Sequence, residues 1–349
     1  ALADQLTIAL DAMGGDLAPR MVVQGAAIAR ERFPLVRYLL FGDQGKLAPL
    51  LDKAPALRAQ STVCHTDVMV SNDVKPAAAL RSGRRSSMRL AIDAVEKGEA
   101  AGVVSAGSTG ALMTMAKVVL GTLPGIHRPA ISTFFPSERG ETVMLDLGAN
   151  LVCDANNLVE FAVMGEVFAR TVLGLVQPTI GILNVGSEDV KCHDEVREAA
   201  QILRASELGP YFHGFVEGDD IMAGTVDVVV TDGFTGNIAL KTLEGTARLY
   251  SNFLKGAFRS SLFARLGYLF ASHALGKVRK RTDPRRYNGA MFLGLNGVVV
   301  KSHGSTDKVG FANAIGVAID LAQNGCNNKI REELERLTAS PSGPEAATG

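Results

Sequence analysis

Short apolar runs alternate along this chain with longer stretches of helical periodicity, and a loop rich in Gly, Ser, Asn or Asp follows many of the runs. That alternation is typical of successive β-α-β units, so it predicts an α/β fold on a mostly parallel sheet. A helix is expected after each run, the first opening at Pro19 and continuing to about Glu31. The predicted strands are 6–10, 101–106, 141–147, 178–185, 226–232 and 296–302.

The sequence of 349 residues contains neither a repeat of fixed period nor a linker long enough to divide the chain, and these two observations determine the predicted domain organisation. We predict a single α/β catalytic domain over residues 1–337, built as one body or as two lobes. The small, polar, proline-bearing segment 338–349 is predicted to be a disordered tail.

Charge and cysteine usage limit the possible surroundings and partners of the protein. Lys and Arg together number 36, as do Asp and Glu, so no global charge draws the chain to nucleic acid or to a membrane. The four cysteines are scattered without a C-x-x-C pair, which indicates a reducing, cytoplasmic compartment. We also expect neither a signal peptide nor a transmembrane helix.

The loops that follow the predicted strands share a chemistry suited to anions. In an open parallel sheet such loops meet helix N-termini at one edge, where free N–H groups and the helix dipole favour negative charge. Glycine lets the backbone approach a ligand closely, while Ser, Thr and Asn supply hydrogen-bond donors. Six such loops, DAMGGD, SAGSTG, GAN, NVGSEDVK, DGFTGN and SHGSTD, together favour a site for a phosphate-sized anion, although each alone is better explained as an ordinary turn or helix cap.

The candidate phosphate- or substrate-binding residues come from these loops. They are Asp11, Gly14, Gly15, Asp16, Ser105, Gly107, Ser108, Thr109, Gly110, Asn150, Asn184, Gly236, His303, Gly304 and Ser305. His303 is as easily explained as a loop cap.

Several common site motifs are incomplete in this chain. Ser108 occupies the position where the phosphate-binding loop of nucleoside triphosphatases requires Lys. Ala106 occupies the position where the G-x-S-x-G nucleophile elbow of serine hydrolases requires its first Gly. The first loop lacks the G-x-G-x-x-G pattern of dinucleotide sites, and the six histidines show no metal-ligand spacing.

Taken in order, the motifs ALDAMGGD, ALRSGRRSSMRLAID, VVSAGSTGALM, DLGAN, ILNVGSEDVK, VVVTDGFTGN and GLNGVVVKSHGSTD resemble the PlsX family of bacterial phosphate acyltransferases over roughly residues 6–325. The resemblance implies transfer of a fatty acyl group from acyl-acyl carrier protein to inorganic phosphate, giving acyl phosphate for phospholipid synthesis. It also implies a three-layer α/β/α fold similar to phosphotransacetylases and isocitrate or isopropylmalate dehydrogenases, and a homodimer. A membrane glycerol-3-phosphate acyltransferase is a further candidate partner.

The catalytic pair that the resemblance implies is Lys191 and Asn237. A thioester is already activated and phosphate is already a nucleophile, so positioning and charge stabilisation suffice, without metal or organic cofactor. Lys191 would hold the phosphate dianion, and Asn237 would donate its amide to the thioester oxygen. The residues alone favour a plainer interpretation, in which Lys191 is a solvated helix lysine and Asn237 is a helix cap.

Residues 245–290 form a basic, aromatic stretch with ten Lys or Arg and one acid, Asp283. Apolar side chains recur there at steps of four, which predicts an amphipathic helical hairpin at about 241–286. It could serve as a dimer interface, a docking surface for an acidic carrier protein, a membrane-surface anchor or an ordinary core helix; nucleic acid fits the helical spacing least. The resemblance favours reversible attachment to the inner face of the membrane together with carrier contact, and the candidate membrane-contacting residues are Leu254, Phe258, Leu262, Phe263 and Leu266.

Three rival interpretations stay open on the sequence. A short-chain phosphotransacetylase that uses acyl-CoA would share the fold and the phosphate chemistry. A dehydrogenase of the same broad fold is disfavoured by the missing dinucleotide pattern. A non-catalytic, membrane-associated scaffold would form no acyl phosphate.

Overall fold

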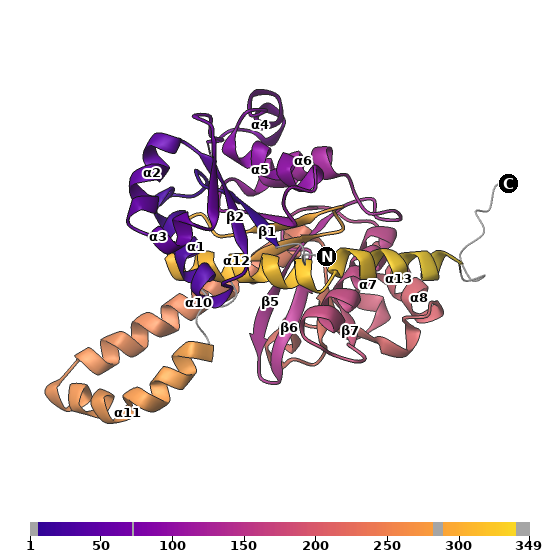
Figure 1. The fold of residues 1–349 in the computed structure, drawn as a ribbon. Helices are drawn as coiled ribbons and strands as arrows, with labels where there is room; N and C mark the ends of the chain where they lie inside the picture. The colour runs from indigo at the N-terminus through magenta and orange to yellow at the C-terminus, as the bar shows by residue number, and fades with distance from the viewer. Residues whose placement is uncertain (1–5, 72, 282–288, 340–349) are drawn as a thin grey trace.

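A single mixed sheet of eleven strands lies at the centre of the computed structural model, which describes residues 6–71, 73–281 and 289–339 (Figure 1). Its strand order is β3-β2-β1-β4-β11-β10-β5-β6-β9-β7-β8. All six predicted strands are present, as β1, β4, β6, β7, β9 and β11. The strands are β1 (Thr7–Asp11), β2 (Arg37–Gly42), β3 (Ser61–His65), β4 (Gly102–Ser105), β5 (Ala130–Ser137), β6 (Gly140–Leu145), β7 (Ile180–Leu183), β8 (Phe212–Val216), β9 (Val228–Val230), β10 (Ala290–Leu293) and β11 (Val298–Lys301).

Helices cover both faces of this sheet and bury an apolar core against each. One core includes α1 (Arg20–Arg32), α2 (Gln44–Asp52), α3 (Pro55–Arg58), α7 (Ala155–Val172), α8 (Asp194–Ala205), α12 (Lys308–Gln323) and α13 (Cys326–Ala339). The other includes α4 (Pro76–Ser82), α5 (Ser87–Glu96), α6 (Thr109–Leu120) and α9 (Asp220–Ala223). Pro19 directly precedes α1, as predicted. Helix α13 continues past the boundary predicted at 338, and residues 340–349 lie outside the described residues.

The strands do not all point the same way, which corrects the expectation of six loops at one edge. β1, β2, β3, β4 and β11 are mutually parallel, and so are β6, β9, β7 and β8. Three antiparallel pairs, β11 with β10, β10 with β5, and β5 with β6, separate these two groups and reverse their direction. The loops after β1, β4 and β11 therefore belong to one half of the sheet, and those after β6, β7 and β9 to the other.

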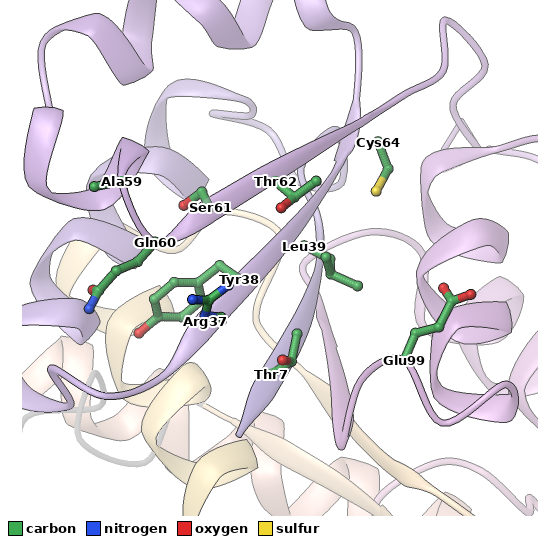
Figure 2. A pocket seen from close by; sticks show the side chains of 10 residues that line it. All are labelled: Thr7, Arg37, Tyr38, Leu39, Ala59, Gln60, Ser61, Thr62, Cys64 and Glu99. Carbon is green, nitrogen blue, oxygen red and sulfur yellow. The ribbon is translucent and has the colours of Figure 1, made fainter. Parts of the chain in front are cut away.

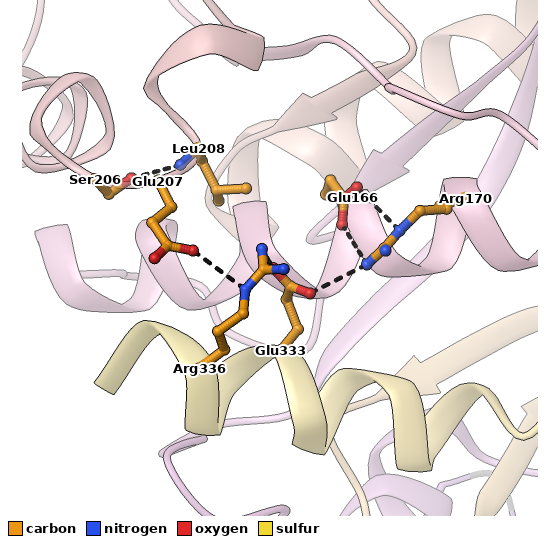
Figure 3. Close-up of polar contacts among 7 residues, drawn as sticks. All are labelled: Glu166, Arg170, Ser206, Glu207, Leu208, Glu333 and Arg336. Carbon is orange, nitrogen blue, oxygen red and sulfur yellow. Dashed lines mark hydrogen bonds and ion pairs between the residues drawn. The ribbon is translucent and has the colours of Figure 1, made fainter. Parts of the chain in front are cut away.

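An ion-pair network fastens the last helix to the body (Figure 3). Arg170 of α7 contacts Glu166 at 3.2 Å and Glu333 of α13 at 3.3 Å. Arg336 contacts the second oxygen of Glu333 at 2.6 Å. Because Glu166 and Glu333 are buried, each cation offsets the cost of removing a carboxylate from water.

The predicted hairpin is present and projects away from the sheet (Figure 1). It consists of α10 (Gly233–Arg259) and α11 (Leu262–Arg281), and residues 282–286 of the predicted segment lie outside the described residues. Helix α10 begins at the sheet and continues unbroken through 27 residues into the hairpin. No helix in the described part of the chain combines the length and the apolar character that a membrane crossing requires.

Candidate active site

The loops after β1 and β4 are joined by a buried carboxylate. The hydroxyls of Ser87 and Ser105 each donate to Asp11 at 2.6 Å, and the Met13 N–H donates to the same carboxylate at 3.3 Å. The Gly107 N–H donates to Ser105 Oγ at 3.0 Å. Burial raises the pKa of Asp11, against the opposing effect of these hydrogen bonds. Asp11 and Ser105 are thus engaged inside the protein, where they shape the loops.

Close backbone packing brings the loop after β11 into the same cluster. A Cβ added at Gly14 would lie 2.4 Å from Asp11 Oδ2 and 2.7 Å from the Gly107 nitrogen, so no larger residue fits there. The Asp16 N–H donates to the Gly304 carbonyl at 2.9 Å. Predicted site residues on three separate loops therefore lie side by side.

Helix α6 begins at this cluster with Ser108 as its N-cap residue. The Ser108 side chain makes no capping hydrogen bond to the helix. The first N–H groups of a helix have no partner within it and carry partial positive charge, so those following Ser108 suit an anion. Thr109 is exposed and Gly110 partly so, which leaves this helix end open to a ligand.

Lys301, which the sequence interpretation did not select, lies at the end of β11 in this cluster. Its ammonium donates to the Ser302 carbonyl. Burial and the nearby Lys241 of α10 together lower the pKa of Lys301 to about 8, although Asp11 and Asp16 oppose the shift. Two cations and two carboxylates thus meet where β1, β11 and α10 approach one another.

His303 lies next to this group and has the capping role considered above. Its Nδ1 accepts from the Ser305 N–H at 3.3 Å and lies 3.0 Å from Ser305 Oγ. Burial and then Lys241 lower the pKa of His303. His303 and Ser305 are therefore near the candidate site while they also stabilise their own loop.

A second buried carboxylate organises the loop after β6. Asp146 Oδ1 accepts from the N–H groups of Ile131, Gly148 and Ala149 at 2.9, 3.2 and 3.1 Å. Its Oδ2 accepts from Asn150 N at 2.6 Å and Asn150 Nδ2 at 3.0 Å. Burial raises the pKa of Asp146, and these hydrogen bonds lower it. Asp146 was missed as a site residue, although a carboxylate placed directly after an apolar strand was a signal available in the sequence.

Helix α10 starts against this loop and carries Asn237. Asp232 is the N-cap residue, and its side chain accepts from the Thr235 N–H at 2.8 Å. The interpretation of Asn237 as a helix cap is therefore wrong, because the cap lies five residues earlier. Asn237 Nδ2 instead donates to the Leu147 carbonyl at 3.1 Å.

Lys191 lies on the loop after β7, in a single 3-10 turn (Asp189–Lys191) ahead of α8. It is not in an α-helix, contrary to the plainer interpretation. Its Nζ lies 3.0 Å from Glu188 Oε1, and both side chains are exposed. Asn184 on the same loop donates to the Gly186 carbonyl at 2.8 Å. Since β7 and β9 pair in parallel, this loop and the start of α10 lie at the same end of neighbouring strands.

Helix α10 connects the two halves of the site. Asn237 and Lys241 are four residues apart, which places them on one face of the helix. Lys241 is close enough to Lys301 and His303 to lower the pKa of each.

A cavity of about 360 Å³ lies at the other end of β1 and β2, away from these loops (Figure 2). Thr7, which lines it, is the first residue of β1, whereas Asp11 is the last. Tyr38 belongs to the core on one face of the sheet, while Leu39 and Cys64 pack on the other. No group of three potential His, Cys, Asp or Glu metal ligands occurs among the residues that the structure describes.

Comparison with known proteins adds a family and a fold to this geometry. The model of a family described as "Fatty acid synthesis protein" matches residues 6–329. A protein of Rhodospirillum centenum named phosphate acyltransferase is 68% identical, over 99% of each chain. In fold, the chain is similar to a phosphotransacetylase from Streptococcus pyogenes, with 20% identity, a TM-score of 0.61 and coverage of 93% and 95%. It is also similar to 4-hydroxythreonine-4-phosphate dehydrogenase from Klebsiella pneumoniae, with 13% identity, a TM-score of 0.50 and coverage of 93% and 99%.

Proposed function

This chain belongs to the fatty acid synthesis protein family and is a phosphate acyltransferase, and on that premise we propose that it transfers a fatty acyl group from acyl-acyl carrier protein to inorganic phosphate. The observation that carries the proposal is the 68% identity over 99% of both chains to a phosphate acyltransferase. The non-catalytic scaffold considered above is not retained, because the relative is an enzyme.

The proposed reaction forms one bond and breaks another. A phosphate oxygen attacks the thioester carbonyl carbon, a C–O bond forms, and the C–S bond breaks to release the carrier thiolate, which takes up a proton from water. Negative charge develops on the carbonyl oxygen on the way. The protein therefore has to hold phosphate, place the thioester and stabilise that oxygen.

Asn237 is suited to the last of these tasks. Its amide nitrogen carries two hydrogens, and one is directed at the Leu147 carbonyl at 3.1 Å. The second is available to the developing oxyanion. Because the first bond fixes the amide plane, the donor is oriented before the substrate arrives.

Lys191 and the α6 terminus share the binding of phosphate in this proposal. Lys191 is exposed and pairs with the equally exposed Glu188 on its own turn, at 3.0 Å. A dianion competes well for such a solvent-screened cation. The N–H groups after Ser108 supply further donors to phosphate or to the acyl carrier.

The hairpin supports the choice of a carrier protein as donor. Lys255, Arg259 and Arg265 are exposed on it and complement an acidic carrier. Several of its apolar side chains are also exposed, so the interpretation as an ordinary core helix is wrong. We assign this apolar surface to peripheral attachment at the inner face of the membrane, where a glycerol-3-phosphate acyltransferase would consume the product. A homodimer is proposed as well, with its interface elsewhere on the protein.

A donor comparison tests the proposal. The protein is incubated with phosphate and either acyl-acyl carrier protein, long-chain acyl-CoA or acetyl-CoA, and acyl phosphate is trapped with hydroxylamine. We expect product from the carrier donor without added metal, and little from either CoA thioester. Equal turnover with acetyl-CoA would favour a phosphotransacetylase, the second candidate that the fold similarity supports.

A further inference from the structure

One buried carboxylate holds an entire turn at the end of β6. Asp146 accepts from three consecutive residues of that turn, Gly148, Ala149 and Asn150, and from Ile131 on β5. The ladder between β6 and β9 continues past the strands, since Asp146 N donates to the Thr231 carbonyl at 3.0 Å. The turn is thus fixed both to the sheet and to the segment that leads into α10.

The first turn of α10 packs directly on this structure. The Gly233 N–H donates to the Asn150 carbonyl at 2.7 Å. A Cβ added at Gly236 would lie only 1.9 Å from the backbone oxygen of Asp146, which no side chain tolerates. Gly236 is therefore required for contact between helix and turn, and Asn237 follows immediately.

We propose that Asp146 is a positioning residue for Asn237: its carboxylate fixes the turn of residues 147–150, and the turn fixes the amide of Asn237 through the Leu147 carbonyl. The proposal rests on the role of Asn237 in the proposed function.

The chemistry of the carboxylate explains why another residue would not serve. An ionised carboxylate only accepts hydrogen bonds, and both Asp146 oxygens face N–H donors. Asparagine has nearly the same shape, but its NH₂ group would point at N–H groups on one side. The turn would then shift, and with it the carbonyl that orients Asn237. A displacement of about 1 Å at a catalytic group costs about 100-fold in rate.

The first test is Asp146→Asn in the full-length protein. We expect kcat to fall about 10- to 100-fold while KM for phosphate changes less than about two-fold, because the defect lies in oxyanion geometry. Added to Asn237→Ala, the same change should lower kcat by less than about two-fold more, since the positioned group is already absent. Asp227→Asn is the matched control, because Asp227 accepts from Thr179 N and Oγ1 at 2.8 Å at the opposite end of β9, and it should leave kcat unchanged.

A second pair of variants keeps the proposal testable if Asp146→Asn does not fold. Gly236→Ala forces α10 away from the Asp146 backbone, whereas Gly245→Ala adds a methyl group in the same helix with nothing within 4 Å. We expect a loss of kcat in the first and full activity in the second, with circular dichroism verifying that both fold.

The outcomes separate this inference from the proposed function. Unchanged kcat in Asn237→Ala would remove the role of Asn237 itself. A large loss in Asn237→Ala combined with normal kcat in folded Asp146→Asn or Gly236→Ala would overturn only the positioning role. Independent, multiplicative losses in the double variant would also overturn it.

Discussion

Lys301 on β11 pairs in register with Ser105 on β4, whose hydroxyl donates to Asp11 at 2.6 Å. The register places a partly buried ammonium beside the loops that form the candidate phosphate site. Burial, together with the repulsion of Lys241, lowers its pKa to about 8. An anion bound between these lysines would offset that repulsion.

We expect the KM for phosphate to rise as pH increases through about 8. Lys301 is cationic below its pKa and neutral above it, so its attraction for the phosphate dianion is lost on the alkaline side. The measurement is phosphate KM from neutral to alkaline pH. Lys301→Gln should raise KM at neutral pH and remove the alkaline dependence.

Lys241→Gln is a control for which the direction of the change in the pKa of Lys301 can be predicted. Removing this neighbouring cation relieves repulsion, so the pKa of Lys301 should rise and the increase in KM should move to higher pH. An alkaline increase that persists in Lys301→Gln, or does not move in Lys241→Gln, would show that another group titrates.

The proposed catalytic pair predicts two different kinetic defects. Asn237→Ala should lower kcat by about 10²–10³, as loss of one oxyanion donor does elsewhere. Lys191→Ala should mainly raise KM for phosphate, because its role is in binding. Steady-state kinetics with acyl-acyl carrier protein distinguish the two. Near-normal kinetics in both folded variants would mean that neither side chain takes part.

Local sequence patterns predicted six of the eleven strands but not the directions in which they run. The run at 141–147 reads correctly as a strand, and β6 is there. Its direction is set by β5, which pairs with it antiparallel and was not predicted. That pairing reverses half of the sheet, and a pattern within one run carries no information about the direction of its neighbours. The single-edge arrangement failed for this reason.

The residues of the candidate site were likewise predicted from the sequence only in part. Asp11, Gly14 and Gly107 were selected from their loops, and the structure brings them together. Lys301 escaped notice because its partial burial results from the approach of strands and of α10 that are distant in sequence. Lys191 and Asn237 came from family resemblance, and their catalytic roles stay predictions.

The His127–Glu160 pair predicts a pH-dependent contribution to stability. His127 Nδ1 lies 2.5 Å from Glu160 Oε1, and this contact raises the pKa of His127 above 6.5. A raised folded-state pKa means that the contribution is complete below the unfolded-state pKa and is lost as pH rises through the folded-state value. Because His127 is exposed, the effect should be at most about 1 kcal/mol.

Thermal unfolding of the wild type and His127→Gln as a function of pH checks this expectation. The wild type should be the more stable below the unfolded-state pKa of His127, and the difference should shrink on the alkaline side. A difference that stays constant with pH would show that titration of the imidazole makes no contribution, because the backbone bond from His127 N to Glu160 at 2.9 Å is present in both proteins.

The hairpin predicts membrane binding in which charge and apolar surface act together. Basic side chains are drawn to anionic headgroups at about 1 kcal/mol each, and apolar side chains then enter the headgroup boundary. Co-sedimentation with vesicles should therefore increase with the fraction of anionic lipid and decrease with salt, since screening weakens the first contribution.

Replacing Leu262, Phe263 and Leu266 together with Gln should release the protein from vesicles. These side chains are 75%, 88% and 55% exposed, so their loss should not unfold the chain, and turnover of a water-soluble donor should persist because the site loops lie on the sheet. Gln at Leu35 and Val176, which are exposed elsewhere, is the matched control and should leave binding unchanged. Light scattering reports the oligomeric state of each variant. If the triple variant still sediments with vesicles, or loses its dimer, these residues form a protein interface and do not contact the membrane.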